Sequence, residues 1–483
     1  MIFSTIEYGI FFCITAFIYY LAPAGLRWLW LLLAGIFFYG YSRPVYVLIP
    51  VIITLISYVG GIQIEKAANE KKAQQYFVTC VAAIAGMLVF FKYTNFFSAT
   101  IVDIINFGSQ KLSGSPAVVH NNFLINLAAP LGISYITFQA IGYMIEIKRG
   151  NHKAERHLGH FSTFIFFFPK IVAGPVERAH NFLPQLKITQ PFKYENLSSG
   201  LQLVVWGLFK KIVIADRLSI YIGAVYGNHE HHSGITLFVA SAFYVFQMYA
   251  DFSGYTDMAL GFAKVLGFDI MQNFNRPLFA KSVTEFWRKW HISLSTWFGD
   301  YFYTPIAIAK RDWGNWAIVY ASFVTFITLG FWHGANWTFI VFGTLQALIL
   351  TVEFLTRKQR KNIRKKIPAL LNDILGNLFT IAFFGFSLIF FRAASVADAM
   401  SIIKKIITFK GPFFYDTQSM FLFVLISLFY LFAYDLKKEY FNKLFTFSNN
   451  KYWLVRNGYY CLLIMIILAS GVFDGGEFIY FQF

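Results

Sequence analysis

Charged residues are scarce in this sequence. Asp, Glu, Lys and Arg make up 13% of its 483 residues, against roughly 25% in a typical soluble domain. The chain also lacks any long polar stretch that would form a separate soluble domain or an interdomain linker. These absences argue against a water-soluble multidomain protein, and we expect a single membrane domain over residues 1–483.

Several chemical signatures are missing as well. The three cysteines, Cys13, Cys80 and Cys461, lie far apart in apolar segments and give neither a disulfide framework nor a metal-binding spacing. The sequence contains no Walker loop, dinucleotide-binding fingerprint or nucleophile elbow. This pattern weighs against an ATP-driven pump and against a flavin or nicotinamide enzyme, and we expect no metal and no bound cofactor.

Long apolar runs fill the chain instead, with 57% hydrophobic and 20% aromatic residues. Runs of about 17 to 25 apolar residues recur along it, the length that crosses a bilayer as a helix. Lipid offers the backbone no hydrogen bonds, so such runs must be helical. The sequence therefore predicts an all-α polytopic membrane protein with roughly 11 transmembrane helices. The expected spans are residues 5–22, 28–41, 45–64, 76–92, 122–147, 199–225, 235–263, 317–350, 369–391, 419–436 and 453–472.

The net charge of +17 comes from basic residues that gather in short loops between the predicted spans. This distribution follows the positive-inside rule of membrane proteins and is not that of a nucleic-acid-binding protein. We place these loops in the cytoplasm, which puts the aromatic tail, residues 474–483, on the extracytoplasmic side. The basic loops lie within Lys66–Lys72, Lys148–Arg156, Arg357–Lys366 and Lys437–Arg456.

Two segments do not have the pattern of simple spans. In residues 158–180 the apolar run Phe164–Phe168 is followed by Pro169-Lys170 and by Gly174–Arg178. Apolar segments that contain Pro, Gly and charges are typical of re-entrant segments that line a cavity. Residues 282–303 mix tryptophans with basic side chains, which favours an amphipathic helix lying at the membrane interface.

One ionisable residue interrupts a predicted span. His333 lies in the motif Gly330–Trp337, inside the apolar run 317–350. An ionisable side chain at membrane depth is costly and indicates a functional site, and a neutral imidazole there can act as a general base. A hydrogen-bonded structural histidine is the alternative.

The neighbours of His333 add two spacings. On a continuous helix, Asn336 and Trp337 would share the face of His333, because residues three and four apart are neighbours. Gly330 and Gly334 would form a pair of small residues that lets another helix approach closely. We therefore expect this helix to be packed against a partner helix at His333.

A second histidine, His291, lies in the motif Glu285–Ser295, one helical turn before Ser295. The tryptophans of this motif would by themselves explain the segment as an aromatic anchor at the membrane interface. From the residues alone, the catalytic and the anchoring interpretations are both open.

Acidic residues and a histidine cluster give weaker signals. Asp251 and Asp257 lie in an apolar stretch and need partners or water. Asp251 is interpreted as the cap of a helix that begins near Gly254, and the role of Asp257 is left open. The run His229–His232 lacks the spacing and the helix of a zinc-binding H-E-x-x-H motif, so we expect no metal site there.

The segment Phe478–Phe483 is strongly aromatic. Chain ends usually fray, and an end of this composition would expose apolar surface unless it docked against the protein or a partner. Tyr480 brings a hydroxyl group into this segment.

Taken together, these motifs resemble the membrane-bound O-acyltransferase family. The resemblance is to its bacterial branch of alginate O-acetylases, peptidoglycan O-acetyltransferases and the D-alanylation membrane protein, and it covers nearly the whole chain. It implies transmembrane, re-entrant and interfacial helices arranged around a central tunnel. Its most specific parts are Tyr249–Gly267, Asn273–Pro277, Glu285–Ser295 and Gly330–Trp337.

The resemblance also implies roles for individual residues. His333 matches the family's catalytic histidine, and His291 matches a second histidine on the cytoplasmic side of the same tunnel. The segment around Tyr480 resembles the tail of the small partner protein of the D-alanylation system, in which a tyrosine is proposed to carry the acyl group. Residues expected to support the site are Trp332, Asn336, Asp257 and Ser295.

The implied function is transfer of an acetyl group across the membrane for O-acetylation of an extracytoplasmic polysaccharide, either peptidoglycan or an alginate-like exopolysaccharide. The expected donor is acetyl-CoA or an acyl carrier thioester. The expected location is the bacterial cytoplasmic (inner) membrane, and the expected partner is a secreted or membrane-anchored esterase-like (SGNH) transferase.

Two alternatives stay open: D-alanyl transfer to teichoic acid, and a polytopic transporter or flippase without acyl-transfer chemistry. The chain shows no internal repeat of the kind that marks many transporters.

Overall fold

A computed structural model describes residues 1–113, 130–415, 417–441, 448, 450–473 and 478. Over these residues the chain forms helices and no strands. Eight of the helical segments are long and apolar enough to cross a membrane by length and composition, and the described residues contain two shorter apolar helices, Ile6–Leu21 and Ala24–Gly40. The predicted all-α polytopic membrane protein is confirmed, whereas the predicted number of spans is not tested.

The described residues up to Val265 form ten α-helices. They are α1 (Ile6–Leu21), α2 (Arg27–Gly40), α3 (Leu48–Glu65), α4 (Glu70–Ser113), α5 (Ile133–Lys148), α6 (Leu158–Phe166), α7 (Ala179–Lys187), α8 (Tyr194–Leu208), α9 (Asp216–Gly227) and α10 (Gly234–Val265).

The residues described after Val265 form ten more. They are α11 (Val283–Lys289), α12 (Ile292–Phe298), α13 (Thr304–Ala309), α14 (Asn315–His333), α15 (Trp337–Leu355), α16 (Arg357–Arg364), α17 (Ala369–Arg392), α18 (Val396–Thr408), α19 (Gln418–Tyr440) and α20 (Trp453–Ser470). Two π-helical segments, Phe209–Ala215 and Gly299–Tyr303, join α8 to α9 and α12 to α13.

Side-chain caps explain where several helices begin. Ser233 accepts a hydrogen bond from the backbone N–H of Thr236 at the start of α10. Ser282 does the same for Glu285 at the start of α11. Such caps satisfy backbone donors that have no partner inside the helix. The sequence thus sets the ends of the helices that surround the candidate site.

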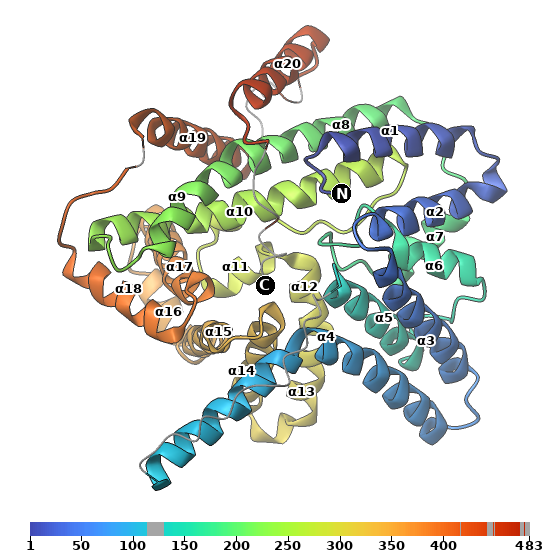
Figure 1. The fold of residues 1–483 in the computed structure, drawn as a ribbon, viewed down its shortest axis with the longest axis horizontal. Coiled ribbons are helices and arrows are strands. Elements are labelled where there is room, and N and C mark those ends of the chain that lie inside the picture. Colours follow the sequence, from blue (N-terminus) through green and yellow to red (C-terminus); the bar gives the residue numbers. More distant parts are fainter. Residues whose placement is uncertain (114–129, 416, 442–447, 449, 474–477, 479–483) are drawn as a thin grey trace.

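Helix α10 is the centre of the fold. In its most apolar stretch 72% of the residues are buried, against 11% for α4 and α20. It packs closely along α8, where a Cβ atom added to Gly207 would lie 2.5 Å from the carbonyl oxygen of Gly254. In Figure 1, α8, α9 and α10 run along the long axis, with α11 and α12 beside α10 and with α14 and α15 below them.

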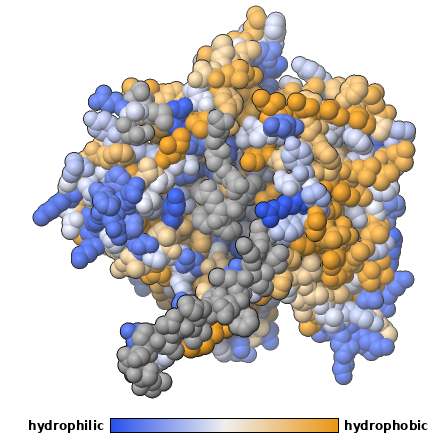
Figure 2. Space-filling view, viewed as in Figure 1, coloured by the Kyte–Doolittle hydropathy of each residue, from blue (hydrophilic) through white to orange (hydrophobic). Residues whose placement is uncertain are grey.

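The outer surface is apolar over most of the spanning helices. Large hydrophobic side chains such as Ile6, Phe17 and Phe37 are exposed, as expected for helices that face lipid. Figure 2 shows hydrophobic residues gathered on the right, over the region of α1 to α3, and hydrophilic residues gathered on the left, in the region of α16 and α18. The surface therefore has the character expected of a membrane protein.

The structure corrects several predicted spans. The run 317–350 is two helices, α14 and α15, separated by a break after His333. The span predicted at 76–92 belongs to the much longer α4, and α10 is continuous through Asp251, so Asp251 does not cap a helix that begins near Gly254. The N-terminal part of the span predicted at 122–147 falls on residues 122–129, which lie outside the described residues.

The two irregular segments are both broken. Helix α6 ends at Phe166, and turns over residues 167–174 follow before α7 begins. The single helix predicted over 282–303 is wrong: α11 and α12 are separated at Trp290 and His291, because His291 has a left-handed backbone with φ of 44°. The tryptophans of this segment, Trp287, Trp290 and Trp297, are buried in the protein. The re-entrant and interfacial locations of the two segments stay predictions.

The loop 228–233 and helix α18 lie against each other. Lys405 of α18 donates hydrogen bonds to the backbone carbonyls of His229 and Glu230, at 2.9 and 2.5 Å. These two connections therefore lie on the same side of the helical bundle. The three spans predicted between them would put them on opposite sides, and the division of 317–350 into α14 and α15 removes that conflict.

Candidate active site

His333 is the last residue of α14, and the hairpin formed by α14 and α15 places it. The two helices approach closely at Gly330, where an added Cβ atom would lie 2.3 Å from the carbonyl oxygen of Phe339 and 3.2 Å from the Cα atom of Gly343. Small residues allow this contact between helices. The expectation of close packing around Gly330 is therefore confirmed, but the partner is the next helix of a hairpin.

The ring of His333 is buried, with 6% of the residue exposed. Its centroid lies 4.9 Å from Trp332, 5.1 Å from Phe391 and 6.1 Å from Phe342. An imidazole among aromatic rings is shielded from water, which suits a site where a reactive intermediate must be protected from hydrolysis.

Lys92 of α4 holds the end of this helix. Its Nζ atom donates hydrogen bonds to the carbonyl oxygens of Trp332 and His333, at 2.5 and 3.1 Å. The last carbonyls of a helix have no partner within the helix, and a cation there is favourable because the C-terminus carries partial negative charge. Lys92 therefore fixes the backbone from which the His333 side chain projects.

Asn336 does not share a helical face with His333, because α14 ends first. Its Oδ1 atom accepts a hydrogen bond from the N–H of Thr338 and caps α15, and its Nδ2 atom donates to the carbonyl oxygen of Ala394 at 3.0 Å. The premise on which its supporting role was predicted is wrong. In the structure Asn336 shapes the turn that follows His333.

His291 is the first residue of the turn that leads into α12, and it is 1% exposed. Its Nδ1 atom lies 2.9 Å from Oδ1 of Asn273, in the loop that follows α10. Burial lowers the pKa of the His291 imidazole to about 3, because a low-dielectric environment disfavours the charged form. His291 is therefore neutral at physiological pH.

The segment that carries His291 is tied to the broken segment after α6. Ser293 donates from its hydroxyl to Oδ1 of Asn273 at 2.9 Å and accepts from the backbone N–H of Val176 at 2.9 Å. Glu177 accepts a hydrogen bond from the N–H of Met271 at 2.6 Å. Three segments far apart in the sequence thus meet beside His291.

Aromatic rings bring the two histidines together. The ring of Trp332, next to His333, lies 6.5 Å from that of His291. Tyr135 of α5 lies 6.4 Å from His291 and 5.9 Å from Trp332. The structure thus places the predicted residues His291, His333 and Trp332 in one buried region.

Two buried donors lie in this region. Tyr135 and Trp332 are 4% and 5% exposed, and neither the Tyr135 hydroxyl nor Trp332 Nε1 has a hydrogen-bond partner among the residues that the structure describes. Buried donors without partners are costly and rare in native proteins. A bound acyl group would offer them a carbonyl oxygen.

The other predicted supporting residues lie elsewhere. The Ser295 hydroxyl donates to the carbonyl oxygen of Trp290 at 3.0 Å, so it stabilises its own turn. Asp257 forms an ion pair of 2.7 Å with Lys210, from the π-helical segment between α8 and α9. Asp257 therefore lines a separate polar pocket, which lies beside the region of the two histidines.

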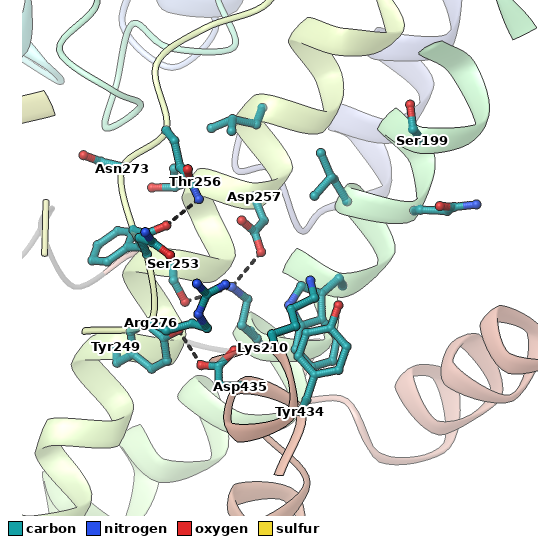
Figure 3. Close-up of a pocket in the computed structure, with 18 of the residues that line it drawn as sticks. Ser199, Lys210, Tyr249, Ser253, Thr256, Asp257, Asn273, Arg276, Tyr434 and Asp435 are labelled. Atoms are coloured by element: carbon teal, nitrogen blue, oxygen red, sulfur yellow. Dashed lines mark hydrogen bonds and ion pairs between the residues drawn. The ribbon is translucent and has the colours of Figure 1, made fainter. Parts of the chain in front are cut away.

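That pocket has a volume of about 340 Å³ and is lined by polar, charged and aromatic side chains. Figure 3 shows Lys210 and Asp257 side by side in its lining, joined by their ion pair, with Arg276, Tyr434 and Asp435 nearby. Lys438 and Arg276 add positive charge, and Asn273 forms part of its wall. The pocket thus lies one hydrogen bond from His291, and its charges suit an anionic organic ligand.

Sequence analysis missed a set of buried lysines. Lys170, Lys210 and Lys211 are at most 3% exposed, and Lys211 pairs with Asp216 and Asp251 at 2.8 Å each. The rule that singled out His333, that an ionisable group in an apolar stretch indicates function or pairing, applies equally to these residues and to Lys92. Lys92 was placed at the end of its predicted span and Lys170 in a re-entrant segment, whereas Lys210 and Lys211 lie in the middle of the predicted span 199–225 and were overlooked.

The aromatic tail is described at one residue, Phe478. Its side chain is fully buried, 4.6 Å from the ring of Tyr255 and 5.6 Å from that of Phe252. Phe252 in turn lies 4.6 Å from His291. The expected docking of the tail is therefore confirmed at Phe478, whereas Tyr480 lies outside the described residues.

Comparison with known proteins identifies the family. The model of the membrane-bound O-acyltransferase (MBOAT) family matches residues 151–395, which contain both histidines. The chain belongs to the membrane-bound O-acyltransferase family. The predicted resemblance is thereby confirmed.

Individual MBOAT relatives are also similar. A probable alginate O-acetylase AlgI of Azotobacter vinelandii is 35% identical over 341 residues, which is 70% of this chain and 65% of the relative, so less than two thirds of that protein is matched. A peptidoglycan O-acetyltransferase of Helicobacter pylori is 31% identical over 79% of this chain and 74% of the relative. A teichoic acid D-alanyltransferase of Bacillus subtilis is 29% identical over 66% of this chain and 79% of the relative.

Proposed function

We propose that this chain is a membrane O-acyltransferase that passes an acetyl group from a cytoplasmic thioester toward an extracytoplasmic polysaccharide. The observation that carries the proposal is that His291 and His333, from separate segments, both lie near the Trp332 ring, at 6.5 and 4.9 Å between ring centroids. Family membership and the names of the relatives support the same class of reaction.

In the proposed reaction, His333 accepts the proton of a hydroxyl group while its oxygen attacks the thioester carbonyl. The carbon–sulfur bond breaks, and the proton returns to the leaving sulfur through His291 on the donor side. The products are an ester and a free thiol, and both imidazoles end neutral. Trp332 Nε1 and the Tyr135 hydroxyl are suited to hold the carbonyl oxygen as negative charge develops on it.

The donor is acetyl-CoA or an acyl carrier thioester. Both carry a phosphate on a long arm, and the pocket beside Asn273 offers Arg276, Lys438 and Lys210 to such a group. We assign this pocket to the cytoplasmic side because the predicted basic loop Lys437–Arg456 begins there. This assignment places the thioester near His291.

The first acceptor is the hydroxyl of Tyr480, which would carry the acetyl group as a phenyl ester on the extracytoplasmic side. Burial of Phe478 beside Phe252 supports an approach of this segment to the histidines. A secreted or membrane-anchored esterase-like transferase would then move the acetyl group to peptidoglycan or an alginate-like polymer. The protein would reside in the bacterial inner membrane.

The test is transfer of labelled acetyl from acetyl-CoA by the purified full chain in lipid nanodiscs. His333→Gln should lower the initial rate by about a thousandfold, within the range known for lost general acid–base catalysis. His231→Gln, an exposed loop histidine, is the matched control and should leave the rate unchanged. A His333→Gln variant that transfers at the wild-type rate would disprove the catalytic assignment.

The acceptor is tested in the same preparation. Label should appear on the wild-type chain as an alkali-labile ester and should be absent from Tyr480→Phe, while hydrolysis of acetyl-CoA continues. Equal labelling of Tyr480→Phe would disprove the relay and leave the enzyme proposal standing. Labelling from a D-alanyl carrier in place of acetyl-CoA would assign the chain to D-alanylation, and no transfer from either donor would favour a transporter.

A further inference from the structure

Asn273 lies at the point where the loop after α10 meets the turn of His291. Its side chain is fully buried. Its Oδ1 atom lies 2.9 Å from Nδ1 of His291, 2.9 Å from the hydroxyl of Ser293 and 3.3 Å from the backbone N–H of Ser293. Three polar atoms of one turn therefore converge on a single oxygen.

The backbone N–H of Ser293 decides which end of the Asn273 carboxamide faces this turn. A backbone N–H can only donate, so the atom opposite it is the oxygen and not the NH₂ group. The Ser293 hydroxyl agrees, because it accepts from the N–H of Val176 and thus has its own proton available for Asn273. The orientation of the amide follows from donors on either side of it.

An amide oxygen cannot donate a hydrogen bond, so the hydrogen between Asn273 and His291 belongs to His291. The neutral imidazole carries one N–H, which is then on Nδ1, and the lone pair is on Nε2. If the amide were reversed, its NH₂ group would select the opposite tautomer and turn the lone pair toward the loop.

We propose that Asn273 is a positioning residue that sets the tautomer of His291, so that Nε2 accepts and returns the proton of the transfer reaction. The inference rests on the proposed function, because the tautomer matters only if His291 moves a proton. Asn273 is also one of the residues that line the polar pocket, and its Nδ2 atom has no hydrogen-bond partner among the described residues. Asn273 thus connects the pocket to the ring.

The surroundings of His291 define what a charge at position 273 would do. Two titratable groups lie near the ring: Tyr135 of α5, and His333 of α14 next to Trp332. The His291 ring also contacts Phe252 of α10 and is hydrogen-bonded to Asn273 of the loop, and neither of these residues is charged. Burial keeps the pKa of His291 at about 3, so the wild-type ring stays neutral across the usual assay range.

Asn273→Asp is the informative variant, because it keeps the acceptor for Nδ1–H and for Ser293 but adds a negative charge. A carboxylate beside the ring stabilises imidazolium and raises its pKa. Below the raised pKa the ring is already protonated and cannot accept the proton. The acetyl-transfer rate should therefore acquire a new acid limb, falling about tenfold for each pH unit below that value, while the rate at high pH stays near wild type.

Asn273→Leu removes the acceptor altogether and should lower the rate by about tenfold or more at every pH, without a new limb. Asn196→Asp, a matched charge change in the first turn of α8 away from the pocket, should leave both rate and profile unchanged. Thermal melting of each variant in nanodiscs controls for folding. A superimposable pH profile for a folded Asn273→Asp variant would overturn the inference.

A direct readout is independent of activity. Nitrogen-15 spectra of histidine-labelled protein, with His291→Gln as the assignment reference, should show a protonated Nδ1 and an unprotonated Nε2 in the wild type. The opposite tautomer would overturn the inference whatever the enzyme does. Absence of transfer by the wild type would instead contradict the proposed function, so the two failures are distinguishable.

Discussion

The two histidines of the site are held in different ways. His291 is held through its ring, which is hydrogen-bonded to Asn273 in a turn with left-handed backbone. His333 is held through its backbone, at a helix end whose carbonyls accept hydrogen bonds from Lys92. Its ring packs among aromatic side chains.

The difference predicts how mutations near each histidine should affect the acetyl-transfer rate and its pH dependence. A hydrogen bond to a ring nitrogen sets the chemical form of the side chain, so changes around His291 should alter pH dependence. Packing and capping at a helix end set position, so changes around His333 should alter the rate at every pH. Misplacement by about 1 Å can cost a hundredfold in rate, whereas one neutral hydrogen bond contributes about 1 kcal/mol.

The largest effect on the acetyl-transfer rate should come from Gly330→Val, which displaces His333. Its Cβ atom would lie 2.3 Å from the carbonyl oxygen of Phe339, so the hairpin must open and carry His333 away from the donor side. We expect the acetyl-transfer rate to fall by about a hundredfold at all pH values. Initial rates at equal protein level measure this.

Gly86→Val in α4, where nothing lies within 4 Å of the added atom, is the matched control. Gly330→Ala should give a smaller loss than Gly330→Val. If the rate stayed within twofold of wild type, or if the loss were confined to low pH, the positional account of His333 would be wrong.

The break that creates this hairpin shows how far the sequence could lead. The residues carried the signal, because Gly334 follows His333 and Asn336 is a favourable residue for starting a helix. The prediction followed the uninterrupted hydropathy of 317–350 instead and placed a single span there. Hydropathy reports the solvent around a segment, and two helices of a hairpin in lipid share the same solvent, so it could not reveal the turn.

An intermediate effect should come from Lys92→Gln. The neutral side chain loses the charge that offsets the negative end of α14, and the carbonyls of Trp332 and His333 lose their partner. We expect the transfer rate to fall by about tenfold without a change in the shape of the pH profile, since position is what is lost. Rates measured from pH 5 to 9 test both statements.

Lys92→Arg keeps the cation and should recover most of the rate, and Lys111→Gln at the exposed end of the same helix is the control. Loss of activity in Lys92→Arg equal to that in Lys92→Gln would show that charge at this helix end is irrelevant.

The residues found from the sequence and those missed differ in a physical way. His333 was found as an ionisable residue inside an apolar run, and His291 and Trp332 were found because they lie in family motifs. Lys92 lies 240 positions or more from the carbonyls it caps, and the part of Asn273 in setting the tautomer depends on the side chain of Ser293. Contacts between distant segments depend on tertiary packing, which periodicity and local spacing do not encode.

The smallest effect on the acetyl-transfer rate should come from Ser293→Ala, which tests what orients Asn273 beside His291. The variant removes the hydroxyl that donates to Asn273, but the backbone N–H of residue 293 still donates to the same oxygen, so the amide orientation and the tautomer survive. The loss of one neutral hydrogen bond, about 1 kcal/mol, predicts a decrease in rate of about fivefold. The pH profile should keep its wild-type shape, as it should not in Asn273→Asp.

Thr296→Ala, which removes an exposed hydroxyl from the same helix, is the control. A new acid limb in Ser293→Ala would mean that the serine hydroxyl, and not the backbone N–H, orients Asn273, and the tautomer would then depend on a single side-chain donor.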